Sequence, residues 1–231
     1  MLDFERYEVM TFDCYGTLID WEPGIIDAVN GILRAHGLEL SGEKILKIYA
    51  ALESRAEARE FKNYKSVLRA VVEGMAIILK FEPSEEELGR LHESLKQWEP
   101  FPDTVEALKA LGRRFKLAVI SNVDDDLFAF TNERLGIDFD WVVTSEQVRA
   151  YKPSLQNFRD ALEKIGVRRD GVVHVAESLY HDIAPAKELG LTTVWINRRG
   201  GYEGNGATPR AYAEPDLEVP DLSALVELIG D

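Results

Sequence analysis

The chain has a single cysteine, Cys14, among its 231 residues. No intramolecular disulfide can form, and a reducing compartment such as the cytoplasm is the expected location. The sequence also lacks any run of about 18 apolar residues, so it predicts no membrane-spanning helix. The opening stretch, MLDFERYE, has neither the basic start nor the apolar run of a secretory signal. We therefore expect a cytoplasmic protein that does not bind a membrane.

Basic residues are scarce, with 27 Lys and Arg against 41 Asp and Glu and a formal net charge of −14. This balance argues against a nucleic-acid partner, because neutralising phosphates requires clustered Lys and Arg. A negatively charged substrate would have to be attracted by a few local cations against an unfavourable overall field. Hydrophobic residues make up 45% of the chain, which is enough to build a substantial core.

Five short apolar runs have the length and the Val, Ile and Trp content of buried strands rather than helices. They lie at 9–12, 116–121, 141–144, 172–176 and 192–197. Amphipathic segments typical of helices lie at 103–112, 124–135, 154–165 and 182–190. Strands that alternate with helices imply right-handed crossovers. The sequence therefore predicts an α/β fold with a Rossmann-like parallel sheet covered on both faces.

Residues 18–97 break this alternation with an almost wholly helical pattern. Ser followed by Glu at 41–43 and 84–87 indicates two helix starts there. Because the block follows the first strand, we interpret it as a helical cap inserted over the carboxyl end of the sheet. The expected domains are a core of residues 1–17 and 98–231 and a cap of residues 18–97. The Gly-rich segment 198–210 predicts a surface loop rather than a phosphate cradle, since no helix pattern follows it.

Polar side chains follow the first four predicted strands in turn. Ligands of open parallel sheets bind beyond the carboxyl ends of the strands, so these side chains are expected to converge on one crevice. In chain order they are Asp13, Ser121, Asn122, Lys152, Glu177, Ser178 and Asp182. Their joint placement, rather than any one of them, predicts a functional site.

This arrangement resembles the haloacid dehalogenase superfamily over nearly the whole chain, including the helical insert after the first strand. The matching motif residues are Asp13 with Thr17, then Ser121, then Lys152, and finally the acidic pair Glu177 and Asp182. Phosphatases of this superfamily carry a second Asp two places after the nucleophile. That Asp protonates the leaving oxygen, a role worth roughly 10²–10⁴ in rate.

Tyr15 stands at that second position in this chain. A tyrosine, whose usual pKa is about 10, is a poor acid for this step near neutral pH, whereas a halide leaving group needs no proton. The stretch DCYGTLID at 13–20 resembles the L-2-haloacid dehalogenase branch, whose motif is Asp-x-Tyr-Gly-Thr.

The resemblance implies cofactor-free hydrolysis of a small 2-haloacid through an aspartyl ester on Asp13. Lys152 would hold Asp13 ionised, and Asp182 would position or activate the hydrolytic water. Thr17 would hold the nucleophile in place. The residues expected to contact the substrate are Tyr15, Ser121, Asn122, Glu177 and Ser178. A homodimer would also suit the resemblance, although no residue identifies its interface.

The chain departs from the dehalogenase pattern at several positions. Tyr49 and Ala50 stand where the branch carries an aromatic residue followed by an arginine, early in the first long cap helix. Arg55 and Arg59 lie further along that helix and are expected to form a solvated face. Phe158 stands where the branch has a tyrosine, and we expect it in the core. In the fourth motif, Glu177 and Leu179 stand where the branch has Ser and Asn.

A glutamate at position 177 is compatible with several functions. An acid at this position is closer to the phosphatase pattern, in which it helps to hold Mg²⁺. It could instead pair with Lys152 or recognise a cationic group on an amino-acid substrate, as in the azetidine-2-carboxylate ring opening known in this superfamily. A Mg²⁺-dependent phosphatase is therefore an alternative, and so is a degenerate member that only binds a small acid or a protein partner.

Overall fold

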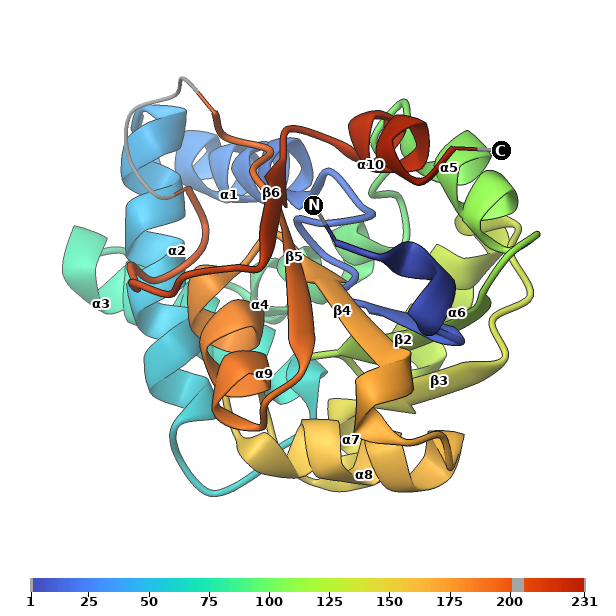
Figure 1. The fold of residues 1–231 in the computed structure, drawn as a ribbon. Helices are drawn as coiled ribbons and strands as arrows, with labels where there is room; N and C mark the ends of the chain where they lie inside the picture. Colours follow the sequence, from blue (N-terminus) through green and yellow to red (C-terminus); the bar gives the residue numbers. More distant parts are fainter. Residues whose placement is uncertain (1, 201–205, 231) are drawn as a thin grey trace.

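The core of the molecule is a parallel sheet, seen in a computed structural model that describes residues 2–200 and 206–230 (Figure 1). Within these residues the sheet has six strands in the order β3-β2-β1-β4-β5-β6, each pairing parallel to its neighbour. The strands are β1 (Val9–Phe12), β2 (Lys116–Ser121), β3 (Trp141–Thr144), β4 (Val172–Ala176), β5 (Thr192–Ile196) and β6 (Leu217–Val219). The predicted strands and the α/β class are therefore confirmed, and β6 is an addition.

Helices cover both faces of the sheet because successive residues of a strand point to opposite sides. Met10 and Phe12 of β1 join one buried cluster, whereas Val9 joins a second cluster with Phe158. Among the helices after residue 98, those that contribute to the first cluster are α5 (Thr104–Leu111), α6 (Asp125–Leu135) and α10 (Leu222–Ile229). Those that contribute to the second are α8 (Leu155–Ile165) and α9 (Ala184–Glu188). Phe158 is fully buried, as expected.

The shorter elements differ most from the prediction. The helix expected at 182–190 begins earlier, as the single π-turn η3 (Leu179–Ile183), and continues as α9. The other short elements are η1 (Phe4–Arg6), α7 (Ser145–Val148) and η2 (Arg169–Gly171). Ser178 caps η3, because its hydroxyl accepts the His181 backbone N–H at 2.9 Å. A π-turn at this place changes which side chains face the sheet edge.

Four helices stand between β1 and α5 and pack on one another at one side of the sheet (Figure 1). They are α1 (Trp21–Ala35), α2 (Gly42–Glu57), α3 (Tyr64–Leu79) and α4 (Glu85–Leu95). The predicted helix starts are present. Ser41 caps α2, and Ser84 forms a capping box with Glu87 at the start of α4. The predicted helical cap is thus confirmed as an insert between β1 and β2.

The two chain segments that join the insert to the sheet run side by side. Asp20 N–H donates to Glu99 O at 2.9 Å, and Phe101 N–H donates to Leu18 O at 3.1 Å. Ile19 and Pro100 form an antiparallel bridge between these bonds. The junction lies close to the expected boundaries, and the division into residues 1–17 with 98–231 and residues 18–97 stays a prediction.

The segment 198–210 is more than a surface loop in its described part. Ala207 and Thr208 are buried, and Ala207 N–H donates to the Glu22 carboxylate at 3.0 Å. Residues 201–205 of that segment lie outside the described residues. The prediction of a plain surface loop was wrong for Ala207 and Thr208, because the acceptor that anchors them, Glu22, comes from the distant helix α1.

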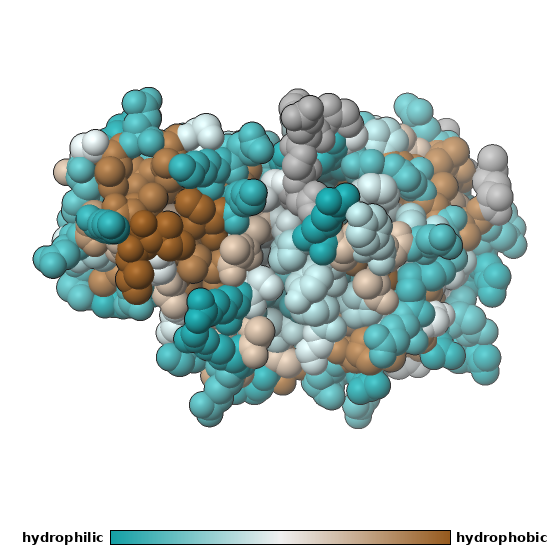
Figure 2. Space-filling model, turned by 90° about the vertical axis from the view of Figure 1, so that its left-hand side faces the viewer, coloured by the Kyte–Doolittle hydropathy of each residue, from teal (hydrophilic) through white to brown (hydrophobic). Residues whose placement is uncertain are grey.

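An apolar patch is visible on the cap side of the molecule (Figure 2). Two strongly exposed apolar residues, Ile77 at 79% and Ile78 at 53%, lie on the cap helix α3.

The expected homodimer stays a prediction. Over residues 2–200 and 206–230, no helix is both long and apolar enough to cross a membrane.

Candidate active site

Asp13 follows β1 directly and is positioned by backbone and side-chain hydrogen bonds. Its N–H extends the ladder to Val175 O at 3.1 Å, and its Oδ2 accepts from Thr17 Oγ1 at 2.6 Å. Thr17 Oγ1 also accepts the Glu177 N–H at 2.8 Å, so the hydroxyl proton is directed to Asp13. The turn between them needs Gly16, whose φ is 93°, a region that residues with a Cβ rarely adopt. The turn at Gly16 therefore explains why Thr17 stands four positions after Asp13.

Lys152 holds Asp13 together with a second carboxylate. Its Nζ donates to Asp13 Oδ1 at 2.8 Å, to Asp182 Oδ1 at 2.7 Å and to Ile120 O at 2.7 Å. These three bonds use all three ammonium protons. Burial works against the charged amine, but the two carboxylates raise the pKa of Lys152 above its ordinary value. The side chain, 1% exposed, is therefore a fixed cation.

Asp182 receives a second donor that the sequence analysis missed. His174 Nε2 lies 3.0 Å from Asp182 Oδ1, and Thr11 Oγ1 lies 2.8 Å from His174 Nδ1. Because a carboxylate can only accept, Nε2 carries the proton of this pair. Burial would raise the pKa of Asp182, yet Lys152 and His174 keep it below its ordinary value. The sequence signal for His174 was a lone imidazole inside the apolar run VVHVA.

The Lys152 ammonium acts to lower the pKa of two carboxylates, Asp13 and Asp182. Burial raises the pKa of Asp13, the Lys152 ammonium opposes this rise, and the neighbouring Asp182 adds to it. The Thr17 hydroxyl also favours the carboxylate form of Asp13. Asp13 and Asp182 therefore titrate as a linked pair around one ammonium group.

The Asn122 side chain forms two hydrogen bonds with the backbone of Lys152. Its Oδ1 accepts the Lys152 N–H at 2.7 Å, and its Nδ2 donates to Lys152 O at 3.1 Å. The amide is thus a clamp that sets the position of the lysine, and it also donates to Glu57 Oε1 at 3.2 Å. Ser121 is buried, and its Oγ has no hydrogen-bond partner within the described chain.

Tyr15 is turned into the cap–core junction. Its hydroxyl lies 2.8 Å from Thr131 Oγ1 on α6, and its ring packs edge-on against Trp98. Burial raises the pKa of Tyr15 well above its ordinary value, and nearby anionic groups add to the rise. Tyr15 is therefore unsuited to donate a proton to a leaving group at neutral pH.

Glu177 and Ser178 lie at the end of β4, as expected. Lys152 pairs with Asp13 and Asp182, and within the described chain Glu177 does not join these ion pairs. The Glu177–Lys152 pair, one of the alternatives left open for Glu177, is therefore not formed, because the lysine protons are already used. Glu177 Oε2 instead faces Thr208 Oγ1 at 3.4 Å, and burial raises the pKa of Glu177 to about 8. Ser178 Oγ lies 3.2 Å from His181 Nδ1.

A small cavity of about 30 Å³ lies over Asp13, between core and cap. The core residues that line it include Asp13, Asn122, Lys152 and Asp182, and the cap residues are Trp21, Glu53, Glu57 and Tyr64. The glutamates were missed by sequence reasoning, although their i, i+4 spacing places them on one face of α2. Arg55 and Arg59 are exposed and do not line this cavity. They form a solvated face, as expected.

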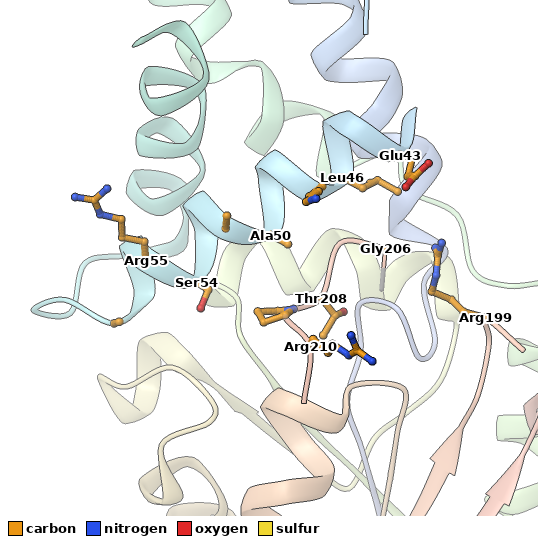
Figure 3. A pocket seen from close by; sticks show the side chains of 13 residues that line it. Glu43, Leu46, Ala50, Ser54, Arg55, Arg199, Gly206, Thr208 and Arg210 are labelled. Atoms are coloured by element: carbon orange, nitrogen blue, oxygen red, sulfur yellow. The ribbon is translucent and has the colours of Figure 1, made fainter. Parts of the chain in front are cut away.

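A larger cavity of about 630 Å³ lies between α2 and the segment after residue 206 (Figure 3). Leu46 and Ala50 of α2 face Thr208 and Arg210 across it, whereas Arg55 points away from them in this view. Thr208 lines both cavities, so the larger one adjoins the space over Asp13.

The described residues contain no group of three or more His, Cys, Asp or Glu side chains arranged to hold a metal ion. Asp13 Oδ1 and Asp182 Oδ1 both face the Lys152 ammonium, and Glu177 is turned to Thr208. The Mg²⁺ site of the phosphatase alternative does not fit this arrangement.

The fold and this site define an α/β hydrolase with an aspartate at its centre. A family model described as "haloacid dehalogenase-like hydrolase" matches residues 7–190. The chain therefore belongs to the haloacid dehalogenase-like hydrolase family, and the family resemblance read from the motifs is confirmed.

The chain is similar to dehalogenases and also to a phosphatase. The haloacetate dehalogenase H-2 of Moraxella sp. (strain B) is 28% identical over 233 residues, covering 98% of this chain and 99% of that protein. The glyceraldehyde 3-phosphate phosphatase of Methanocaldococcus jannaschii is 36% identical over 138 residues, covering 56% of each. The structure of the L-2-haloacid dehalogenase from Xanthobacter autotrophicus with chloropropionic acid covalently bound is 24% identical. It has a TM-score of 0.79 and covers 96% of this chain and 98% of that one.

Proposed function

We propose that this hydrolase cleaves a carbon–halogen bond through an ester intermediate on Asp13, in the manner of an (S)-2-haloacid dehalogenase. The observation that carries the proposal is the combination of Lys152, 2.8 Å from Asp13, with Tyr15 in place of a second acid. The site thus has an oriented carboxylate nucleophile and, at the Tyr15 position, no proton donor for an oxygen leaving group. The full-length similarity to a haloacetate dehalogenase supports the same conclusion.

In the first step an Asp13 oxygen attacks the halogen-bearing carbon. A carbon–oxygen bond forms, the carbon–halogen bond breaks, and the halide leaves with the bonding electrons. In the second step water attacks the carboxyl carbon of the ester, the alcohol product departs, and the Asp13 carboxylate is restored. In sum, the organohalide substrate and water give the alcohol, the halide ion and a proton. Lys152 and Thr17 fix the nucleophile in both steps, which lowers the cost of reaching the reactive geometry.

Asp182 is the candidate for orienting the water. It lines the small cavity, and its Oδ2 is buried with no hydrogen-bond partner within the described chain. Its other oxygen is held by Lys152 and His174. A carboxylate fixed at one oxygen and unpaired at the other is suited to accept a hydrogen bond from water.

A Mg²⁺-dependent phosphatase is the second candidate. The partial-length similarity to a glyceraldehyde 3-phosphate phosphatase and the acid at position 177 favour it. Tyr15 and the lysine-centred arrangement of the carboxylates oppose it. The two candidates differ in their need for a metal and in the product that they release.

The first experiment measures halide release from L-2-chloropropionate in EDTA, with the Asp13→Asn variant as the control. We expect release by the parent protein and none by the variant. Activity that is lost in EDTA and restored by Mg²⁺, together with phosphate release from a phosphate ester, would replace this proposal with the phosphatase.

A single turnover in H₂¹⁸O then tests the intermediate. Hydrolysis of an ester on Asp13 leaves ¹⁸O in that carboxylate and ¹⁶O in the first alcohol product. Mass spectrometry of the peptide that contains Asp13 reports the label. Label found only in the product would mean that water attacks the substrate directly and that Asp13 is not the nucleophile.

A further inference from the structure

The cavity over Asp13 is strongly acidic. Of the described residues that line it, Asp13, Asp182, Glu53 and Glu57 are carboxylic acids, and Lys152 is the single Lys or Arg. Lys152 is already shared by Asp13 and Asp182. Among the described residues that line the cavity, neither cap glutamate therefore has a lysine or arginine of its own, and burial raises the pKa of both.

Glu53 and Glu57 are buried on the inner face of α2. Glu53 is 3% exposed, and the Glu57 side chain is 5% exposed. Glu53 Oε1 accepts from the hydroxyls of Tyr49 at 2.7 Å and Tyr64 at 2.5 Å, and Glu57 Oε1 accepts from Asn122. All three donors are neutral. Buried carboxylates without a cation are costly, which makes the pair unusual unless a positive group joins it.

His181 does not supply that charge. Its Nε2 lies 3.8 Å from Glu57 Oε2, too far for a hydrogen bond, and it has no hydrogen-bond partner within the described chain. Burial lowers the pKa of His181 to about 4, so the ring is neutral at neutral pH. The ring is 8% exposed and lines the same cavity. A buried nitrogen without a hydrogen-bond partner among the described residues therefore lies 3.8 Å from a Glu57 carboxylate oxygen.

Aromatic rings complete the surroundings. Trp21, Tyr15 and Tyr64 line the cavity, and Trp21 packs edge-on against Tyr49 with 5.9 Å between ring centroids. Carboxylates combined with the faces or hydroxyls of aromatic rings form a favourable environment for an organic cation. A second carboxylate on the substrate would meet only repulsion at this end of the cavity.

We propose that the cap glutamates Glu53 and Glu57 form a recognition site for a protonated amine on the substrate. The inference rests on the proposed function, because it names the class of molecule that reaches Asp13: an electrophile that carries an ammonium group. The ammonium would donate to Glu57 and Glu53 while the reactive carbon faces Asp13. The described cations that line the larger cavity do not line the space over Asp13, so they do not offset the glutamates there; they are Lys47, Arg55, Arg199 and Arg210.

The test uses binding, which does not require turnover. Isothermal titration of the full-length protein compares n-propylammonium with propionate, two unreactive probes of similar size and opposite charge. We expect n-propylammonium to bind at least about tenfold more tightly, the size of one charge-assisted hydrogen bond. Glu53→Gln and Glu57→Gln keep the shape and remove the charge, and each should lose most of this preference. Glu60→Gln, at an exposed position just beyond α2, is the matched control and should retain it.

Tighter binding of propionate, or an ammonium preference that survives in both Gln variants, would overturn the inference. In that case the two glutamates are protonated structural groups. Halide release from 3-chloropropylamine, 1-chlorobutane and L-2-chloropropionate separates this result from the proposed function. Ammonium binding without any halide release would retain the recognition site and reject the dehalogenase. Fastest release from L-2-chloropropionate would retain the dehalogenase and reject the ammonium site.

Discussion

Lys152 Nζ lies 2.8 Å from Asp13 Oδ1, although the two residues are 139 positions apart in the chain. Lys152 follows β3 and α7, and the contact arises because β1, β2 and β3 are adjacent parallel strands that end at the same edge. Asn122, at the end of β2, holds the Lys152 backbone beside Asp13. A buried ammonium held by two carboxylates and a carbonyl oxygen is a rigid element.

Replacing Lys152 by Ala should reduce the rate of halide release by at least about 10²-fold, because the nucleophile loses its fixed position. Lys152 also favours the ionised form of Asp13, so its removal should move the acid limb of the kcat/KM profile to higher pH. Lys109→Ala is the control, since that lysine pairs with Glu106 on the surface. A folded Lys152→Ala protein, judged by circular dichroism, with near-normal turnover would remove Lys152 from the mechanism.

Thr17→Val should lower kcat by about 10- to 100-fold, the effect of losing a hydrogen bond to a charged group. The variant loses the 2.6 Å bond to Asp13 and the acceptor for the Glu177 N–H. Thr17→Ser retains both and should recover most of the rate. Equal rates for the Val and Ser variants would show that the hydroxyl has no part in catalysis.

Tyr15→Phe should leave the rate of halide release within about threefold of the parent, because the hydroxyl is bonded to Thr131 rather than used as an acid. The free energy of unfolding should fall by about 1 kcal/mol from the lost hydrogen bond. Thr131→Val should cost a similar amount, and the double variant little more than either, as urea denaturation would measure. A drop in rate of more than about 10²-fold would instead make Tyr15 a catalytic acid.

Glu53 gives the protein a defined pH dependence of stability. Burial raises the pKa of Glu53 from 4.5 to about 7 in the folded state. Between these values the folded protein binds more protons than the unfolded chain, so stability falls as pH rises. The contribution of Glu53 is lost progressively from pH 4.5 to about 7 and amounts to about 3 kcal/mol.

Denaturation curves at several pH values check this prediction. Glu53→Gln has no proton to lose, so its free energy of unfolding should fall less steeply than that of the parent over this range. Glu60→Gln, at an exposed position, should follow the parent. Parallel curves for the parent and Glu53→Gln would mean that Glu53 titrates normally.

Several parts of the site were predictable because they depend on local sequence. Asp13 and Thr17 are four positions apart around one turn, so their contact needs only the strand end and Gly16. The convergence of Asn122, Lys152 and Asp182 required one further assumption, that the strands are parallel and share an edge. The roles of these residues stay predictions, whereas the contacts of Asp13 with Thr17 and Lys152 are present.

Other parts could not be predicted, because they depend on how the cap lies on the sheet. The i, i+4 spacing of Glu53 and Glu57 indicates a common helix face but not whether that face meets solvent or the site. Arg55, two positions after Glu53, is exposed and does not line the cavity over Asp13, whereas Glu53 is buried and lines it. The burial of Thr208 likewise follows from contacts with distant residues.

The sequence by itself determined the parallel sheet, the helical insert and the aspartate after the first strand. Strand and helix periodicity, capping residues and one turn glycine are short-range properties, and each is encoded in a few neighbouring residues. Only the tertiary structure decided which charges face Asp13. It brought Lys152 and His174 to the carboxylates, left Arg55 in solvent, and buried two cap glutamates over the nucleophile. The reason is that the electrostatic character of an interior cavity depends on the packing of distant elements, which no local pattern specifies.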